Sequence, residues 1–179
     1  TVWMPQVEEE VRALAFPYYR DGEVVNIKYR DTKKNFRQVG GAQKTFYKID
    51  DVTDVAIITE GEIDALSLEV AGFKHGISVP DGAPAANSKN YETKFEYLDD
   101  EKLDSIKTFI LAVDNDEPGR KLESELARRL GRDRCLRVTW VEGCKDANEV
   151  LLAHGVEVLV GCINNVQSFP VEGVFSVYD

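Results

Sequence analysis

Hydrophobic and polar residues follow one kind of pattern up to about residue 50 and another beyond it. From residue 54, short runs of consecutive apolar residues alternate with segments in which apolar residues recur every three or four positions. Short apolar runs rich in β-branched residues predict buried strands, and the second spacing predicts amphipathic helices. Because strands that alternate with helices pack as a parallel sheet covered on both faces, we expect an α/β fold.

The elements of this α/β part can be placed one by one. Strands are predicted at 55–59 (VAIIT), 76–79 (GISV), 108–113 (TFILAV) and 136–141 (LRVTWV). Helices are predicted at 61–72, near 90–104, at 115–131, near 146–153 and at 155–166. Together they make a four-stranded, mainly parallel sheet flanked by helices.

The N-terminal fifty residues have a different pattern. Apolar residues at helical spacing in 6–16 (QVEEEVRALAF) predict a helix that Pro17 ends. The segments EVVNIKYRD and NFRQVGG then predict two strands joined by the basic turn DTKKN. We therefore expect a small subdomain of one helix and a basic β-hairpin over residues 1–50, ahead of an α/β domain over 51–168.

Charge is distributed unevenly along the chain. The net charge is −10, yet residues 24–49 hold seven Lys or Arg against one Asp, which leaves −16 for the rest. A run of charge is most often a solvated face. A local basic face can also hold phosphates beside an acidic pocket that a metal neutralises.

The composition indicates a globular protein, with 43% hydrophobic and 30% charged residues. No run approaches the roughly 18 apolar residues of a membrane-spanning helix, so we expect no membrane partner. The three cysteines form no C-x-x-C pair and have no paired histidines. We therefore expect reduced, structural thiols in place of a zinc site or a disulfide framework.

Acidic residues follow three of the four predicted strands. Glu60 and Asp114 each come directly after a strand, and Asp146 lies a few residues after another. Asp116 is two positions beyond Asp114, so an extended backbone points both carboxylates the same way. Since ligands bind at the carboxyl ends of parallel strands, we expect all four acids to meet at one edge of the sheet.

Such a cluster of carboxylates suits a metal ion. Uncompensated, the acids repel one another and raise their own pKa values. Mg²⁺ prefers a few carboxylates together with water and phosphate oxygens. For any one acid, capping of the following helix is the commoner use, and only the set favours a metal centre. Asp64 either turns toward this pocket or complements the helix dipole, and Glu62 is expected to be solvated or capping.

Three segments of the chain resemble known motifs. TEGEIDALS, AVDNDEPGR and CKDANEVL are similar, in order and spacing, to the three motifs of the Toprim family. More narrowly, the chain resembles the primase half of phage primase–helicases and of their organellar relatives called Twinkle. The plant organellar group is the nearest in kind, and the loop SVPDGAP also resembles it. The similarity runs from YYRDGEVVNIKYRD to FPVEGVF.

The resemblance implies roles for the acids. Glu60 matches the glutamate of the first motif, which is a metal ligand and candidate general base. Asp114 and Asp116 match the D-x-D metal ligands, and Asp146 matches the aspartate of the KDAN motif. The implied cofactor is Mg²⁺, for which Mn²⁺ can substitute.

The resemblance also assigns roles to basic residues. Lys28 in VVNIKYRD and Lys34 in DTKKNF match two lysines that contact nucleotide and phosphate. The secondary candidates for the site are Asp64, Arg30 and Lys145.

The implied activity is that of a DNA primase. Such a domain joins nucleoside triphosphates into a short RNA primer on single-stranded DNA, here in organellar DNA replication in the mitochondrion, the chloroplast or both. No Cys-rich module precedes the motifs in this chain and no Walker A motif follows them. We therefore expect a helicase or a zinc-binding module to act as a partner in cis or in trans, with residues 169–179 starting the linker between domains.

Two other functions stay open. Other Toprim proteins hydrolyse phosphodiesters with similar acids, so the chain could be a metal-dependent nuclease, although the basic hairpin favours nucleotide handling. It could also be a non-catalytic module that binds single-stranded DNA or regulates, although all four acids are present.

The aromatic residues near the basic stretch allow two interpretations. They either pack the small β unit or stack on bases, and packing is favoured because strands are rich in aromatics. These residues are Tyr18, Tyr19, Tyr29, Phe36 and Phe46.

Overall fold

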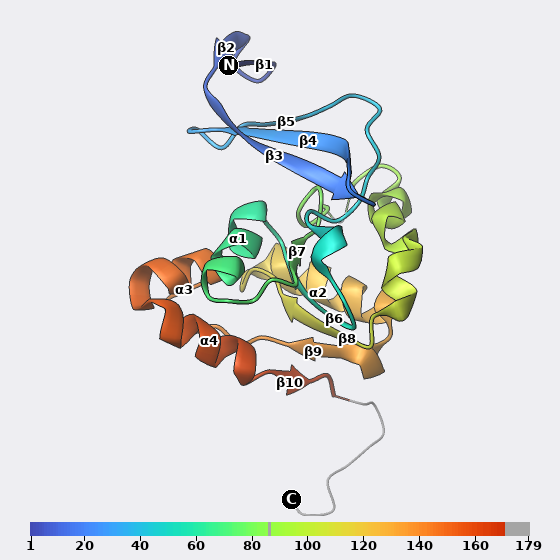
Figure 1. Ribbon diagram of the computed structural model, residues 1–179, viewed down its shortest axis with the longest axis vertical. Coiled ribbons are helices and arrows are strands. Elements are labelled where there is room, and N and C mark those ends of the chain that lie inside the picture. Colours follow the sequence, from blue (N-terminus) through green and yellow to red (C-terminus); the bar gives the residue numbers. More distant parts are fainter. Residues whose placement is uncertain (86, 171–179) are drawn as a thin grey trace, which may run out of the picture.

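The α/β part is built on a five-stranded sheet in the order β10-β9-β8-β6-β7 (Figure 1). The computed structural model describes residues 1–85 and 87–170. Four strands are parallel: β6 (Val55–Thr59), β7 (Gly76–Ser78), β8 (Thr108–Ala112) and β9 (Cys135–Arg137). The fifth, β10 (Gln167–Ser168), runs antiparallel to β9. The expected mainly parallel α/β fold is confirmed. The fifth strand was not predicted because its two polar residues carry no apolar pattern.

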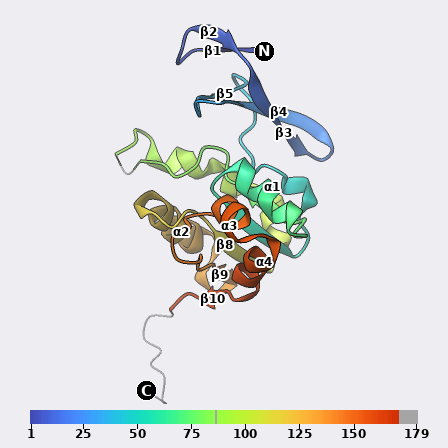
Figure 2. The same ribbon diagram turned by 90° about the vertical axis from the view of Figure 1, so that its left-hand side faces the viewer.

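Helices cover both faces of this sheet (Figures 1 and 2). On β6, Ile57 packs in one buried cluster with α1 (Glu62–Val70), α3 (Ala147–His154) and α4 (Val156–Asn164). Its neighbours Ala56 and Ile58 pack in the other cluster with α2 (Glu117–Leu130). That second face is completed by the 3-10 helices η1 (Ile49–Asp51), η2 (Tyr91–Asp99) and η3 (Glu101–Ser105), while η4 (Arg132–Arg134) precedes β9. Because successive side chains of a strand point to opposite faces of the sheet, Ile57 belongs to one hydrophobic core and its two neighbours belong to the other.

The N-terminal part is entirely β in its regular structure. A hairpin of β1 (Val2–Met4) and β2 (Glu9–Val11) precedes a three-stranded antiparallel sheet of β3 (Ala13–Arg20), β4 (Glu23–Asp31) and β5 (Phe36–Gln38). The predicted strands over EVVNIKYRD and NFRQVGG are confirmed, with the second one shorter.

The predicted helix over residues 6–16 is wrong. Phe16 and Tyr18 are buried two positions apart, which is strand periodicity, and both pair with β4. Pro17 lies between them on β3, an edge strand of its sheet. An edge strand tolerates proline because its missing N–H breaks no ladder hydrogen bond on the open side.

Two other expected elements differ in form. The helical stretch predicted near 90–104 is present as η2 and η3, both 3-10 helices. The strand predicted over 136–141 ends at Arg137. Beyond it, the Val138 N–H still donates to the Leu111 carbonyl at 3.1 Å and the Trp140 indole donates to the Val113 carbonyl at 2.9 Å, so this segment continues along the end of β8.

The small β unit lies against the α/β unit above α1 (Figure 1). Phe16 and Tyr18 pack with Ala65 of α1 and with Tyr47, whose backbone pairs with Ser78 of β7. The Arg20 guanidinium forms an ion pair with Asp100 at 2.9 Å at the far side of this contact. Apolar packing and a partly buried ion pair therefore both join the two units.

Three expectations concern other features of the chain. Within residues 1–85 and 87–170, no helix is both long and apolar enough to cross a membrane. The thiols of Cys135, Cys144 and Cys162 are all buried. The interdomain linker expected over 169–179 lies, from residue 171 onward, outside the described residues.

Candidate active site

Neighbouring parallel strands bring two of the predicted acids together. Thr59 of β6 is paired with Ala112 of β8, so the two strands end at the same level. Glu60 and Asp114 follow these ends, and the Asp114 backbone N–H donates to the Glu60 carboxylate at 3.4 Å. The strand register therefore places both acids at the carboxyl edge of the sheet, as the sequence predicts.

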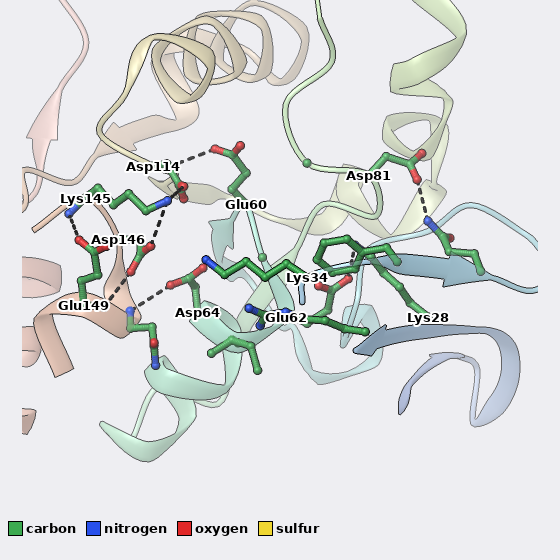
Figure 3. Close-up of a pocket in the computed structure, with 17 residues that line it drawn as sticks. Lys28, Lys34, Glu60, Glu62, Asp64, Asp81, Asp114, Lys145, Asp146 and Glu149 are labelled. Atoms are coloured by element: carbon green, nitrogen blue, oxygen red, sulfur yellow. Dashed lines mark hydrogen bonds and ion pairs between the residues drawn. The ribbon is translucent and has the colours of Figure 1, made fainter. Parts of the chain in front are cut away.

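Three carboxylates form a tighter group at this edge (Figure 3). One oxygen each from Asp64, Asp114 and Asp146 lies within 4.8 Å of the other two. Asp64 is buried in the first turn of α1 and accepts a hydrogen bond of 3.0 Å from the Asn148 N–H. Its side chain therefore turns toward the pocket, which is one of the two possibilities left open by the sequence, the other being interaction with the helix dipole. An all-oxygen donor set fits a hard divalent cation.

Two of the predicted acids also cap helices. Asp116 is the N-cap of α2, where its Oδ1 accepts from the Gly119 N–H at 2.8 Å. Asp146 is the N-cap of α3 and accepts from the Glu149 N–H at 2.8 Å. Asp146 combines this cap with membership of the three-carboxylate group, whereas Asp116 does not line the cavity.

A glycine controls how closely α2 approaches Asp114. A Cβ atom at Gly119 would lie 1.9 Å from the Asp114 carbonyl oxygen. Only a residue without a side chain fits there. Gly119 thus lets the start of α2 pack directly on the backbone that carries Asp114.

Burial and mutual repulsion change the protonation of the cluster. Burial, followed by the charge of Asp114, raises the pKa of Glu60 to about 7. Burial and the nearby Asp146 raise the pKa of Asp64 to about 8. The pKa of Asp114 is raised mainly by burial, although Lys145 opposes this. Three acids of this edge are therefore poorly solvated in their charged form.

Lys145 supplies the nearest positive charge. Its Nζ lies 3.1 Å from Asp114 Oδ2 and 3.8 Å from Asp146 Oδ2. Its side chain is half exposed and reaches the carboxylates from the solvent side. The Lys145 ammonium therefore lies close to both Asp114 and Asp146, two of the three carboxylates that suit a metal ion.

Lys28 is held in a buried network between the two units. Its Nζ lies 2.7 Å from the Glu62 carboxylate and donates to the Pro80 carbonyl at 2.9 Å. The Tyr18 hydroxyl donates to the same carboxylate oxygen. Glu62 is only 4% exposed, so the expectation that it would be solvated or capping is wrong. Its partners come from β3 and β4, which its helical position alone does not reveal.

The other basic candidates face the acids across the cavity. Arg30 and Lys34 line it, and in the described part of the chain neither forms an ion pair. In Figure 3 the Lys34 side chain extends toward the Asp64 carboxylate. Lys34 also has a positive φ of 64°, in the turn between β4 and β5. The β4–β5 face therefore presents free positive charge to the acidic edge.

The cavity between these surfaces has a volume of about 550 Å³. Its lining includes Asp81, which accepts hydrogen bonds from Lys44 at 2.6 Å and from Gln38 at 2.7 Å. Asp81 was not singled out from the sequence. The signal was present, because Asp81 comes shortly after β7 and therefore also lies at the carboxyl edge of the sheet.

Comparison with protein families gives one clear match. The family model described as Toprim-like matches residues 57–151. This range contains Glu60, Asp64, Asp114, Asp116 and Asp146.

Individual relatives match over nearly the whole chain. The Twinkle homolog protein, chloroplastic/mitochondrial, of Arabidopsis thaliana is 39% identical over 193 residues, covering 99% of this chain and 27% of that protein. The primase homolog protein of the same plant is 38% identical over 186 residues, covering 96% of this chain and 55% of that protein. The chain thus spans little more than a quarter of one relative and about half of the other.

A solved structure has the same arrangement of elements. The crystal structure of the primase fragment of the bacteriophage T7 primase–helicase matches with a TM-score of 0.70 and 26% sequence identity. The match covers 83% of this chain and 62% of that fragment.

Proposed function

This chain belongs to the Toprim family and resembles its primase-type members, and we propose that it is the catalytic domain of a DNA primase. The proposed reaction joins ribonucleoside triphosphates into a short primer on single-stranded DNA: a 3′-hydroxyl forms a bond to the α-phosphorus of the next triphosphate, and pyrophosphate leaves. The observation that carries the proposal is the pairing of two surfaces in one cavity. The acids at the sheet edge face Arg30 and Lys34 of the β4–β5 face, and neither forms an ion pair with any other described residue.

A nucleotidyl transfer needs both surfaces. The substrate brings a polyanionic triphosphate, and Arg30 and Lys34 hold it, one as a bidentate guanidinium and the other as a point charge. The acids alone would repel that triphosphate. A plain acidic cavity without the basic sheet would suit a metal but not this substrate.

The metal ligands belong to the acidic surface. Asp64, Asp114 and Asp146 would hold the ion, with Glu60 lining the same cavity. Asp116, the other ligand expected from the motifs, caps α2 and does not line the cavity. Bound Mg²⁺ or Mn²⁺ supplies charge neutralisation at the reacting phosphate and activation of the attacking hydroxyl. Glu60, which lies beside Asp114 at this edge, is the candidate general base for the hydroxyl proton.

The wider context follows from the relatives. We assign residues 1–50 to the basic subdomain, 51–168 to the Toprim domain and the remainder to a linker. The similarity to a chloroplastic/mitochondrial Twinkle homolog suggests organellar DNA replication. A helicase or a zinc-binding module, in cis or in trans, would then deliver the template.

A primer-synthesis assay tests the proposal directly. The chain is incubated with single-stranded DNA of mixed sequence, four nucleoside triphosphates including one labelled, and Mn²⁺ or Mg²⁺. We expect short labelled products that Asp114→Asn and Asp146→Asn each reduce at least about 100-fold, as expected for loss of charge at a metal centre. Thermal unfolding of both variants checks that they fold.

Two outcomes would replace the proposal. Release of nucleotides from labelled DNA without added triphosphates would identify a nuclease. Binding of single-stranded DNA that survives complete chelation, with no synthesis at any nucleotide concentration, would identify a non-catalytic binding module. Synthesis unchanged by both substitutions would overturn the assignment of the site.

A further inference from the structure

Phe36 is the single aromatic residue among the 17 that line the cavity. It begins β5, and 41% of it is exposed. Two other aromatic residues near the basic stretch, Tyr18 and Phe46, are fully buried and serve packing. The structure thus separates Phe36 from the aromatic residues that build the core.

Two cationic side chains lie close to the Phe36 ring. The Lys28 Nζ lies 4.9 Å from the ring centroid and the Arg30 guanidinium carbon lies 5.9 Å from it. Both interactions stabilise the ring's position through its electron-rich face. Lys28 is itself fixed by Glu62 and Pro80. The ring therefore has a defined place beside the phosphate-binding cations while much of it stays open to the cavity.

We propose that Phe36 is a stacking platform for a nucleobase held in the cavity. An exposed aromatic ring beside basic residues is how proteins bind single-stranded nucleic acid and nucleotides without reading their sequence. Arg30 lies opposite Phe36 across the β4–β5 ladder, so phosphate and base contacts come from adjacent residues of one rigid sheet. The metal site and the basic side chains would then hold the phosphates of one substrate, and the Phe36 ring would hold its base.

The inference rests on the proposed function, since it needs a nucleotide or a DNA strand as ligand. The base belongs either to the incoming nucleoside triphosphate or to the template. Both sources present the same flat, apolar face to the ring, and base-free analogues separate them. Inorganic tripolyphosphate has the charge of a triphosphate without a base, and an abasic oligonucleotide has the backbone of a template without bases.

The experiment measures four affinities by calorimetry or fluorescence anisotropy. The ligands are ATP with Mg²⁺, tripolyphosphate with Mg²⁺, a short oligothymidylate and its abasic counterpart. Phe36→Ala should weaken either ATP or oligothymidylate by roughly 5- to 100-fold, the range for loss of one base–aromatic stack. Binding of the matching base-free ligand should change less than about two-fold. Phe36→Trp should restore or tighten the affected affinity.

Leu14→Ala is the matched control. Leu14 is exposed, and it lies opposite the same Arg30 on the β3 side, but it does not line the cavity. Its substitution should leave all four affinities unchanged. Equal weakening of base-containing and base-free ligands by Phe36→Ala, or no weakening of any, would refute stacking. If the wild-type chain bound none of the four, the proposed function itself would fail.

Discussion

At the scale of single residues, the protonation of Asp64 makes the clearest prediction. Its carboxyl has a folded-state pKa of about 8, above the value in an unfolded chain, so the folded state binds the extra proton. Its contribution to stability is favourable at pH 4 and is lost as the pH rises toward 8. Asp64→Asn removes this loss of stability at high pH, because the Asn side chain stays neutral. The metal-free variant should be more stable than wild type at pH 9 by on the order of 2 kcal/mol, or roughly 4–8 °C in Tm, and not at pH 4.

Thermal unfolding across this pH range, in the presence of a chelator, checks the prediction. Saturating Mg²⁺ should stabilise the wild-type chain more than the variant at pH 8, because the ion relieves the same repulsion. Parallel stability curves for the two proteins at every pH would contradict it.

Lys145 predicts a change in metal affinity. Its ammonium lies 3.1 Å from Asp114 and so places positive charge beside the candidate metal group. Lys145→Met removes that repulsion, and Mn²⁺ should bind about 10-fold more tightly, a modest part of a full charge interaction at this distance. Calorimetric titration with Mn²⁺ measures the change. Lys121→Met, which removes a lysine paired with Glu117 outside the cavity, is the control and should have no effect.

At the scale of elements, most of the α/β unit and the β4–β5 strands could be predicted from the sequence, whereas the strands before β4 could not. Strand β6 has the predicted bounds because VAIIT is an uninterrupted apolar run. In QVEEEVRALAF the same residues allow a helical spacing, and only pairing with β4 selects the strand. Asp64 was ambiguous for a similar reason, because its direction depends on Asn148, which lies 84 residues further along the chain. Local patterns fix elements, whereas long-range partners fix the direction of side chains.

The contact between β4 and α1 makes a prediction about stability. Glu62→Gln leaves the buried Lys28 ammonium without its counter-charge, and unfolding in urea should show a loss of about 2–4 kcal/mol. The double variant Glu62→Gln with Lys28→Met should lose less than the two single losses combined, because it removes both charges. Strict additivity would show that the pair is not coupled.

The approach of α2 to Asp114 makes a second prediction at this scale. Gly119→Ala should displace either the start of α2 or Asp114, since no Cβ fits 1.9 Å from a carbonyl oxygen. We expect a loss of about 2–4 kcal/mol in stability and at least a 10-fold weaker Mn²⁺ affinity. Gly161→Ala is the matched control. Gly161 lies inside α4 with open space around it, and this substitution should stabilise by roughly 0.5–1 kcal/mol.

At the scale of the whole molecule, an acidic chain carries a basic face beside its cavity. The net charge of −10 opposes approach of DNA, whereas Arg30, Lys34 and their neighbours on β4 and β5 attract it. Binding of single-stranded DNA should therefore weaken steeply with salt, with a log–log slope of about −0.7 per phosphate contact. Lys34→Ala should make the slope shallower by about 0.7. Lys107→Ala, at a highly exposed lysine outside the cavity, should leave the slope unchanged.

The antiparallel direction of β10 decides where this domain can be tethered to a surface or fused to another protein. Because β10 runs opposite to β9, the chain leaves the sheet at the edge away from the acids. The other terminus lies beside the basic face, where Gln6 and Arg37 join the first hairpin to β5. A surface, bead or fused protein tethered behind residue 170 should leave the cavity open to long DNA, whereas the same tether ahead of residue 1 should crowd its entrance. Immobilised forms of the domain should therefore be anchored through the C-terminal end.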